Sequence, residues 1–593
     1  MLMGGFLLKI MEVIIKVYKS ATKYRGYIIL SSIFSLMTVG INLIYPGLTQ
    51  NMVKIIENNI NLVGTDDISE PMKLIIFNAV FLLIVFILKT LTQFLYSYIS
   101  HYAAWNYVAD IRGKIYGHLQ KLSISYYHDK QTGELMSRVM NDTGAFETLI
   151  AHTVPETAGS IILFVGVTII LFMTNPVLAG LTCIPIPFIL LTAPLMKKIR
   201  QMHKDAQLYV AELNSKLQDN FSGIKEIQIF NRQDDEYTGI YDRAKKHVTS
   251  LLKAMFYGLI MHPTIGFLTS LGNVIVIWVG GYLVLSGNMD ISEIVGFLMY
   301  LSLFYGPVTS FARIIEDMQA GIAGGERVFE VLDAETDVKE KPDAEILPKV
   351  SGNITFENVT FQYNEDGVVL KNVSFDIPAK KMFALVGPTG VGKTTMAALI
   401  PRFYDPTAGR ILIDGHDLKD VTVKSLRDNI SMVLQDVFLF NGTIKENILY
   451  GRPAASDEEV EKAAKMACIH DFIDGLPLKY DTVVGERGVR LSGGQKQRIS
   501  IARSLMCESP VLILDEATSA VDTETEQEIQ DAIQKIAGSC TLIVIAHRLS
   551  TVKRADSIIV LEDGEVKEQG SHDELIGKNG IYKHLVDIQN IKK

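Results

Sequence analysis

The sequence predicts two joined domains of different class. An all-α membrane domain of six transmembrane helices is followed by an α/β domain with a P-loop, a phosphate-binding loop. Two observations predict this: apolar runs of about 20 residues recur up to residue 320, and a later apolar strand leads directly into a GxxxxGK[ST] motif. The expected boundaries are 24–320 for the membrane domain, 321–350 for a charged, proline-containing linker and 351–593 for the α/β domain.

The composition excludes other classes of protein. The chain has 593 residues, with 57 Lys and Arg against 66 Asp and Glu, so its net charge of −9 argues against a nucleic-acid partner. Its four cysteines form no CxxC pair, which indicates neither a zinc site nor a disulfide framework. Residues 1–23 are not expected to be a signal peptide. Because charged residues recur along one face of this segment, we expect an amphipathic elbow helix on the inner membrane surface.

Six apolar runs are long enough to cross the hydrocarbon core at 1.5 Å per residue. They are Tyr27–Gln50, Met72–Ser97, Pro155–Thr174, Val177–Leu195, Phe256–Leu285 and Ile291–Phe311. Basic residues gather after the second and fourth runs, so the positive-inside rule places both termini and both long loops in the cytoplasm. We therefore expect a multi-pass protein of the plasma membrane.

The two long loops, 101–152 and 196–255, are expected to be helical extensions of the spans that reach a cytoplasmic partner. Polar groups within the spans are few. Glu156, Gln93 and His262 could line a cavity, but each could equally satisfy a contact between helices.

The phosphate-binding loop follows the apolar strand Ala384-Leu385-Val386 and reads GPTGVGKT over 387–394. Its glycines allow backbone N–H groups to converge on phosphate oxygens, Lys393 would neutralise the β- and γ-phosphates, and Thr394 would offer its hydroxyl to Mg²⁺. The candidate nucleotide-binding residues here are Thr389, Gly390, Val391, Gly392, Lys393, Thr394 and Thr395. The alternative is a chance glycine-rich turn.

A second buried strand, Val511–Leu514, ends in Asp515 and Glu516. An acidic residue at the carboxyl end of a strand is where open α/β sheets place a metal-bound nucleotide. Asp515 is expected to hold Mg²⁺ through water, and Glu516 to orient or deprotonate the attacking water. Taken alone, Glu516 could simply be an acidic side chain that interacts with the positive end of a helix dipole.

Between these motifs lies Leu491-Ser492-Gly493-Gly494-Gln495, followed by an apolar-periodic helix. Ser492 and Gln495 match a capping box, so the segment could simply start a helix. Two glycines at an uncovered helix N-terminus also make a phosphate site.

LSGGQ, with a phosphate loop upstream and LILDEATS downstream, resembles the ATP-binding cassette (ABC) transporter family. Six spans followed by one cassette resemble its exporter half-transporters, of type I exporter or type IV transporter architecture, and most closely the bacterial homodimeric multidrug and lipid exporters. The resemblance implies a dimer that closes around two ATP molecules with Mg²⁺, in which Ser492, Gly493, Gly494 and Gln495 contact the nucleotide held by the partner subunit.

The same resemblance implies roles for further residues. Tyr363 matches the aromatic that stacks on adenine, although on pattern alone it could be a sheet-core residue. Gln435 matches the glutamine that touches Mg²⁺ and the membrane domain, and His547 the histidine at the γ-phosphate. Glu486 and Asp522 lie in loops that couple the cassette to the membrane domain and to the partner cassette. The family's coupling helices fall at Asp129–Gly133 and Phe221–Ile224.

The function implied is an ATPase-driven exporter that moves hydrophobic or amphipathic substrates out of the cytoplasm or inner leaflet, of the multidrug type. A lipid floppase, a small-peptide exporter and one half of a heterodimeric exporter remain alternatives, since apolar spans suit all of them. The expected partners are a second half-transporter, membrane lipids and the transported small molecule, lipid or peptide.

Overall fold

The computed structural model describes residues 12–60, 69–128, 130–190, 193–363, 367–515, 523–546 and 549–591. The chain separates into two compact units. The helical unit comprises Met1–Gln120 and Gln131–Asp333, and the sheet unit comprises Lys121–Lys130 and Ala334–Lys593.

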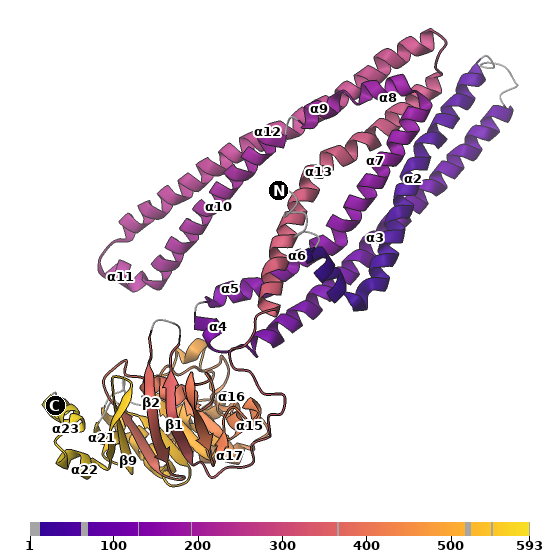
Figure 1. Cartoon of the computed structure of the whole chain (residues 1–593). Coiled ribbons are helices and arrows are strands. Elements are labelled where there is room, and N and C mark those ends of the chain that lie inside the picture. Colours follow the sequence, from indigo (N-terminus) through magenta and orange to yellow (C-terminus); the bar gives the residue numbers. More distant parts are fainter. Residues whose placement is uncertain are drawn as a thin grey trace. The chain divides into compact units, whose positions relative to one another are not determined.

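Long helices dominate the helical unit (Figure 1). Five segments of the described chain are long and apolar enough to cross a membrane. Four of them contain α2 (Arg25–Asn58), α3 (Ser69–Leu119), α7 (Val154–Thr174) and α12 (Gln233–Leu285), and the fifth, Ile291–Ser310, is the first part of α13 (Ile291–Leu332). The fourth expected run falls on α8 (Pro176–Thr182), α9 (Pro185–Leu190) and the start of α10 (Ala193–Ser222). Pro185 withholds a backbone donor at the break between α8 and α9, which explains why the run is divided there.

Shorter elements complete the unit: η1 (Thr22–Tyr24), α5 (Thr132–Ser137), η4 (Arg138–Asp142), α6 (Thr143–Glu147), η5 (Thr148–Thr153) and α11 (Ile224–Ile229). Residues 12–20 are also helical, and Val13 and Val17 on this segment are buried. The first eleven residues of the expected elbow helix lie outside the described residues.

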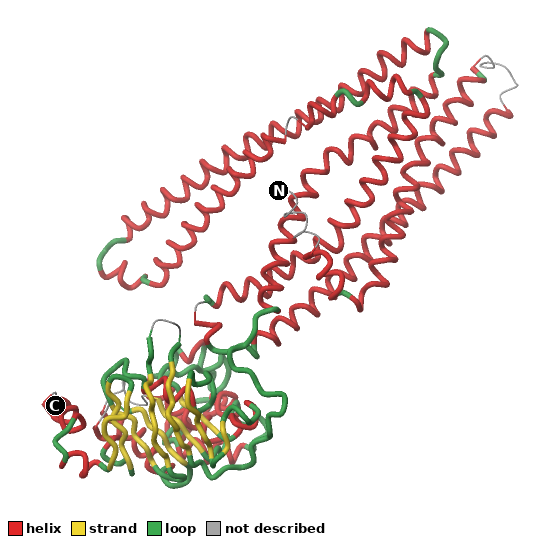
Figure 2. The backbone as a smooth tube through the Cα atoms, viewed as in Figure 1, coloured by secondary structure: helices red, strands yellow, loops and turns green. Residues whose placement is uncertain are grey.

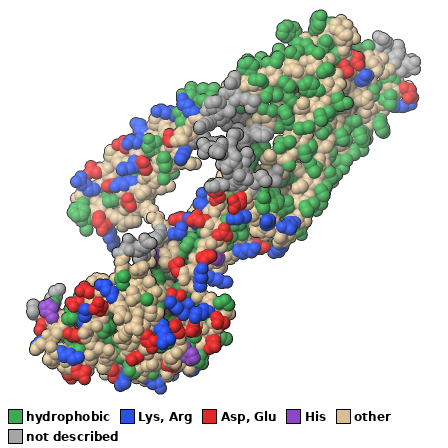
Figure 3. Space-filling model, in the orientation of Figure 1, with side chains coloured by type: hydrophobic (Ala, Val, Ile, Leu, Met, Phe, Trp, Pro, Cys, Tyr) green, Lys and Arg blue, Asp and Glu red, His purple; other side chains and the backbone are tan. Residues whose placement is uncertain are grey.

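Apolar side chains face outward from the long helices. Phe77 on α3 is 69% exposed and Trp278 on α12 is 74% exposed, and Figure 3 shows apolar side chains covering much of the visible face of this unit. Such surfaces are stable in lipid and unfavourable in water, and helices satisfy every backbone polar group within the hydrocarbon. The unit therefore has the construction of a membrane domain.

The long helices pack in two groups. Helix α2 contacts α3, α7 and α13, whereas α10 lies along α12 and is joined to it through α11 (Figure 1). Residues of α7, α8, α12 and α13 share one buried cluster that includes Leu171, Leu178, Val276 and Phe297. Helix α13 continues to Leu332, into the segment expected as a linker, because its apolar period persists through the buried Val328 and Val331.

Two sheets form the framework of the sheet unit (Figure 2). The antiparallel sheet has the order β2 (Leu370–Ile377), β1 (Ile354–Phe361), β4 (Ala408–Ile413), β5 (His416–Asp417). The second sheet has the order β10 (Glu565–Gly570), β9 (Ser557–Glu562), β3 (Met382–Val386), β8 (Thr541–Ile545), β7 (Val511–Asp515), β6 (Ile430–Val433). All of its pairings except β10–β9 are parallel.

Strand β3 is buried on both faces and joins two hydrophobic cores. Met382, Ala384 and Val386 enter one core, and Phe383 and Leu385 enter the other. Successive side chains of a strand point to opposite faces, which explains why this continuous apolar run predicts a buried parallel strand. The strand that carries the phosphate loop is thereby held from two sides.

Helices pack around these sheets. They are α14 (Lys393–Leu399), α15 (Val423–Asp428), α16 (Ile444–Leu449), α17 (Asp457–Met466), α18 (His470–Asp474), η6 (Lys479–Asp481), η7 (Glu486–Gly488), α19 (Gly493–Met506), α20 (Thr523–Ile536), α21 (Leu549–Val552), α22 (His572–Gly577) and α23 (Ile581–Ile591).

A segment of the first long loop belongs to the sheet unit. It includes α4 (Ser125–His128). Ser123, just before this helix, donates from Oγ to Asp337 Oδ2 at 3.0 Å, and the Ser125 hydroxyl donates to the same carboxylate. His128 Nε2 lies 3.4 Å from the Tyr404 hydroxyl. These contacts lie just before the turn at 129–133 that the sequence favoured, and Asp129 lies outside the described residues.

A buried arginine ties the linker to the sheet unit. Arg402 is 2% exposed and donates to Asp405 at 2.8 Å, to the Leu418 carbonyl at 3.0 Å and to the Lys339 carbonyl at 3.0 Å. Arg410 also pairs with a carboxylate, Glu357, at 2.6 Å, but both side chains are exposed. The two arginines differ mainly in burial.

We expect Arg402→Ala to destabilise the sheet unit by about 2–4 kcal/mol, because it leaves a half-buried carboxylate and backbone carbonyls without their donor. Arg410→Ala should cost less than about 1 kcal/mol, as surface ion pairs do. Thermal unfolding of the full-length variants in one detergent compares the two. Equal shifts in the unfolding midpoint would contradict the structural role of Arg402.

Candidate functional site

The phosphate loop connects the end of β3 to the start of α14. Gly390 and Gly392 have φ values of 84° and 103°, in the left-handed region that favours glycine. A Cβ on Gly387 would lie 2.3 Å from the carbonyl oxygen of Leu561, so the backbone there passes too close for any side chain. The loop conformation therefore requires glycine at these positions.

Lys393 directs its ammonium group into this loop. Its Nζ donates to the carbonyl oxygens of Gly387 and Pro388, both at 2.8 Å, and the residue is 5% exposed. The neighbouring Thr394 is exposed. A buried cation at a glycine-rich loop, beside an accessible hydroxyl, has the chemistry needed to bind a polyphosphate.

Tyr363 lies beside the same loop. Its hydroxyl is 2.8 Å from Thr395 Oγ1, and its ring stands edge-on to Phe361 and Tyr404. The side chain is 44% exposed, which argues against the sheet-core alternative. Together with Thr389 and Gly390 it lines a pocket of about 770 Å³, a volume typical of ligand sites.

Asp515 is the last residue of β7 and is 2% exposed. Strand β8 lies between β3 and β7, and all three are parallel, so their carboxyl ends meet at one edge of the sheet. The carboxylate of Asp515 and the hydroxyl of Thr394 are oxygen donors of the kind that Mg²⁺ prefers, so the residues present fit this cation. Glu516, Asp522 and His547 lie outside the described residues.

Gln435 and Glu486 occupy exposed loops of the sheet unit. Gln435 follows β6, the edge strand beside β7, and its side chain is exposed. Glu486 begins the short turn η7, which is flanked by Gly485 with a φ of 76°. Neither position is buried in a core, so both side chains are accessible to a ligand or another domain.

Ser492 caps α19 in the manner of a capping box. Its backbone N–H donates to Gln495 Oε1 at 2.9 Å, and the backbone N–H of Gln495 donates to Ser492 Oγ at 3.3 Å. Ser492 and Gly493 are exposed, whereas Gly494 is buried. The helix-start interpretation and an accessible anion site are therefore compatible.

The phosphate loop and LSGGQ belong to different parts of the sheet unit. Helix α14 packs on β7 and β8, and its Met396 and Leu399 join the core shared with the antiparallel sheet. Helix α19 packs on α16, α17 and β6, and its Ile499 and Ile501 join the other core. Sequence reasoning found both motifs but missed the Ser123, Ser125 and His128 contacts, which no local pattern signals.

Comparisons with known proteins agree with this geometry. Residues 28–308 match the family described as ABC transporter transmembrane region, and residues 370–519 match the family described as ABC transporter. The chain is 41% identical over 484 residues to "Uncharacterized ABC transporter ATP-binding protein YknV" of Bacillus subtilis (strain 168), covering 81% of this chain and 80% of the relative.

Two further relatives cover nearly the whole chain. A "Putative multidrug export ATP-binding/permease protein" of Staphylococcus aureus (strain NCTC 8325 / PS 47) is 38% identical over 570 residues, covering 96% of this chain and 98% of the relative. The structure of a bacterial Atm1-family ABC exporter with ATP bound superposes with a TM-score of 0.81 at 30% identity, covering 95% of this chain and 98% of that one.

The loop glycines provide a matched test. Gly390 and Gly415 both have a φ of 84°, and a Cβ on either would meet nothing within 4 Å. Alanine at each should therefore cost a similar amount of stability, about 1–2 kcal/mol. Only Gly390→Ala should also weaken ATP binding, by at least about tenfold, because it shifts loop amides that face the phosphates. Equal ATP affinity of the two variants, measured by fluorescent nucleotide titration, would argue against this use of the loop.

Proposed function

Since the chain belongs to the ABC transporter family and is an ATP-driven exporter, we propose that two copies form a homodimeric pump for hydrophobic or amphipathic substrates. It is a multi-pass membrane protein whose ATPase domain lies in the cytoplasm. The observation that carries the proposal is the strand–loop–helix site, in which Lys393 is held among loop carbonyls beside the exposed Thr394.

In this proposal each nucleotide is held mainly by one chain. Tyr363 stacks on adenine, residues Thr389 to Thr395 bind the phosphates, and Lys393 neutralises their charge. Thr394, Gln435 and Asp515 would hold Mg²⁺, Asp515 through water, and the bound cation would offset phosphate charge during phosphoryl transfer. Glu516 orients or deprotonates the attacking water, and His547 contacts the γ-phosphate.

The second half of each site comes from the partner subunit. The nucleotide held by one chain is contacted by Ser492, Gly493, Gly494 and Gln495 of the other. Asp522 couples the two cassettes, and Glu486 couples the cassette to the membrane domain. The separation of α14 and α19 into different cores supports this arrangement. This chain retains every motif, so two copies would make two complete sites.

The substrate class rests on the membrane domain and on the relatives. The spans carry few polar groups, which suits hydrophobic or amphipathic molecules. The Staphylococcus aureus relative is named for multidrug export, which favours a multidrug substrate range over a dedicated lipid or peptide substrate.

Transport into inside-out vesicles tests the function. We expect saturable, ATP-dependent accumulation of a fluorescent hydrophobic cation, and stimulation of ATPase by the same compound. Glu516→Gln should bind ATP normally and lower steady turnover by about 10²-fold or more, because the carboxylate acts on water. Labelled lipid and labelled peptide are assayed in parallel. Accumulation of either of these, with no movement of the cation, would overturn the multidrug assignment.

A mixed dimer tests whether the sites are shared. Lys393→Ala and Ser492→Ala should each inactivate a homodimer. In a dimer with one copy of each variant, one site collects both defects and the other is intact. We therefore expect the mixed dimer to trap nucleotide with a phosphate analogue at one site. Trapping no greater than in either variant homodimer, once mixed dimers are shown to form, would contradict shared sites.

A further inference from the structure

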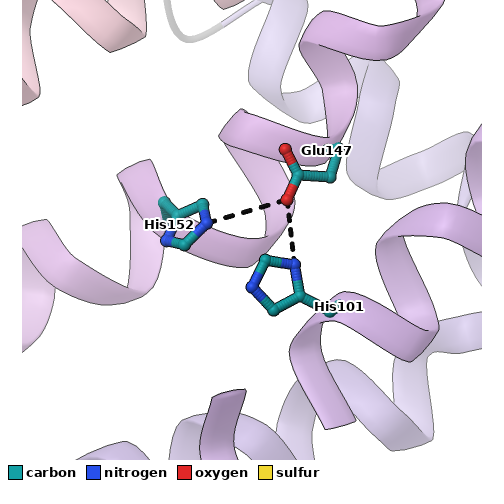
Figure 4. A group of neighbouring side chains, drawn as sticks. All are labelled: His101, Glu147 and His152. Carbon is teal, nitrogen blue, oxygen red and sulfur yellow. Dashed lines mark ion pairs between the residues drawn. The ribbon is translucent and has the colours of Figure 1, made fainter. Parts of the chain in front are cut away.

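Three side chains with metal-ligating atoms converge in the helical unit, outside the nucleotide site (Figure 4). They are His101 on α3, Glu147 at the end of α6 and His152 on η5. His101 Nδ1 lies 2.9 Å from Glu147 Oε1, and His152 Nε2 lies 3.7 Å from the same oxygen. Figure 4 shows the carboxylate directed between the two imidazole rings.

The local backbone is what brings Glu147 and His152 together. Five residues separate them, which would place them about 140° apart around an α-helix of 3.6 residues per turn. Here Thr148–Thr153 forms a π-helix, whose i→i+5 hydrogen bonds put residues five apart on the same face. This rare geometry is frequently found at functional sites.

The spacing of the donor atoms suits a zinc-class cation. Zn²⁺ binds histidine nitrogen and carboxylate oxygen at about 2.0–2.2 Å in tetrahedral geometry, which requires neighbouring donors about 3.3 Å apart. The observed separations of 2.9 and 3.7 Å lie on either side of this value. Glu147 is 15% exposed and the two rings are 36% and 40% exposed, so the site is sheltered but accessible.

A fourth residue orients one of the ligands. His152 Nδ1 lies 3.1 Å from Glu156 Oε1 on α7, the carboxylate–histidine arrangement that fixes the tautomer of a metal-ligating imidazole. With the proton on Nδ1, the lone pair of Nε2 faces Glu147. The Tyr96 hydroxyl donates to the Ala151 carbonyl at 3.1 Å and fastens η5 to α3.

We propose that His101, Glu147 and His152 bind one zinc-class divalent cation, with water as the fourth ligand and Glu156 as a positioning residue. His101 lies about one helical turn after the apolar run Met72–Ser97, and His152 and Glu147 lie about one and two turns before the run Pro155–Thr174. The cation therefore ties the cytoplasmic ends of the second and third spans to each other.

Cobalt binding to the full-length chain tests the proposal. The protein is purified in detergent without a polyhistidine tag and with Cys507→Ser, because Cys507 is an exposed thiol that could bind metal elsewhere. We expect one Co²⁺ per chain with the visible d–d absorption of tetrahedral coordination, displaced by Zn²⁺, and a rise in the unfolding midpoint on adding Zn²⁺.

Matched variants locate the site. His101→Gln and His152→Gln should abolish the cobalt signal, and Glu147→Gln, which keeps the side-chain volume, should weaken binding at least tenfold. Glu156→Gln should weaken it by about 10–100-fold, as loss of a ligand-orienting group does. His203→Gln, at an exposed histidine on α10, should change nothing.

The helical content and the unfolding midpoint of each variant, measured without metal in the same detergent, confirm that its helical unit is folded. If a histidine variant does not fold, cobalt binding by Glu147→Gln and Glu156→Gln is compared with cobalt binding by the unsubstituted chain instead. Two results would overturn the proposal: a cobalt signal that persists unchanged in the folded ligand variants, or the absence of both the cobalt signal and the zinc-induced stabilisation in the unsubstituted chain.

Discussion

The burial of β3 between two cores is the constraint on which the rest of the sheet unit depends. Its side chains alternate between the core shared with the antiparallel sheet and the core shared with α16, α17 and α19. A one-residue shift of this strand would exchange the side chains that its two cores hold, and closely packed cores do not tolerate such changes of volume. The glycine loop after Val386 therefore begins from a fixed point, and Lys393 keeps its position relative to the end of β7.

The surface of the helical unit is adapted to lipid instead of water, but its backbone polar groups must likewise be hydrogen-bonded. Its exterior is apolar because lipid surrounds it, and its helices extend well beyond the bilayer. Helix α12 has 53 residues, which corresponds to about 80 Å, against a hydrocarbon core of about 30 Å. More than half of α12 therefore lies outside the hydrocarbon core, and Pro263 within the helix removes one backbone donor.

The features that could be predicted from the sequence are those determined by residues close together in the chain. The fold class, the strand–loop–helix around Lys393 and the capping box at Ser492 each depend on neighbouring residues, and each is present. The division of the fourth apolar run and the extension of α13 to Leu332 depend on packing around prolines and on continued burial. The His101–Glu147 pair and the Ser123–Asp337 bond join residues far apart in sequence, and the π-helix at Thr148–Thr153 has no reliable sequence pattern.

The capping box at the start of α19 affects the free energy with which two chains associate. In the described residues the cap uses the Ser492 hydroxyl as an acceptor, so its O–H remains able to donate, and the rotamer that presents it is already selected. An incoming phosphate oxygen would meet a hydroxyl oxygen that is already positioned, and the cap would not have to break. Little ordering entropy is then lost at this position when two chains meet, and little is regained when they part, which keeps the encounter readily reversible.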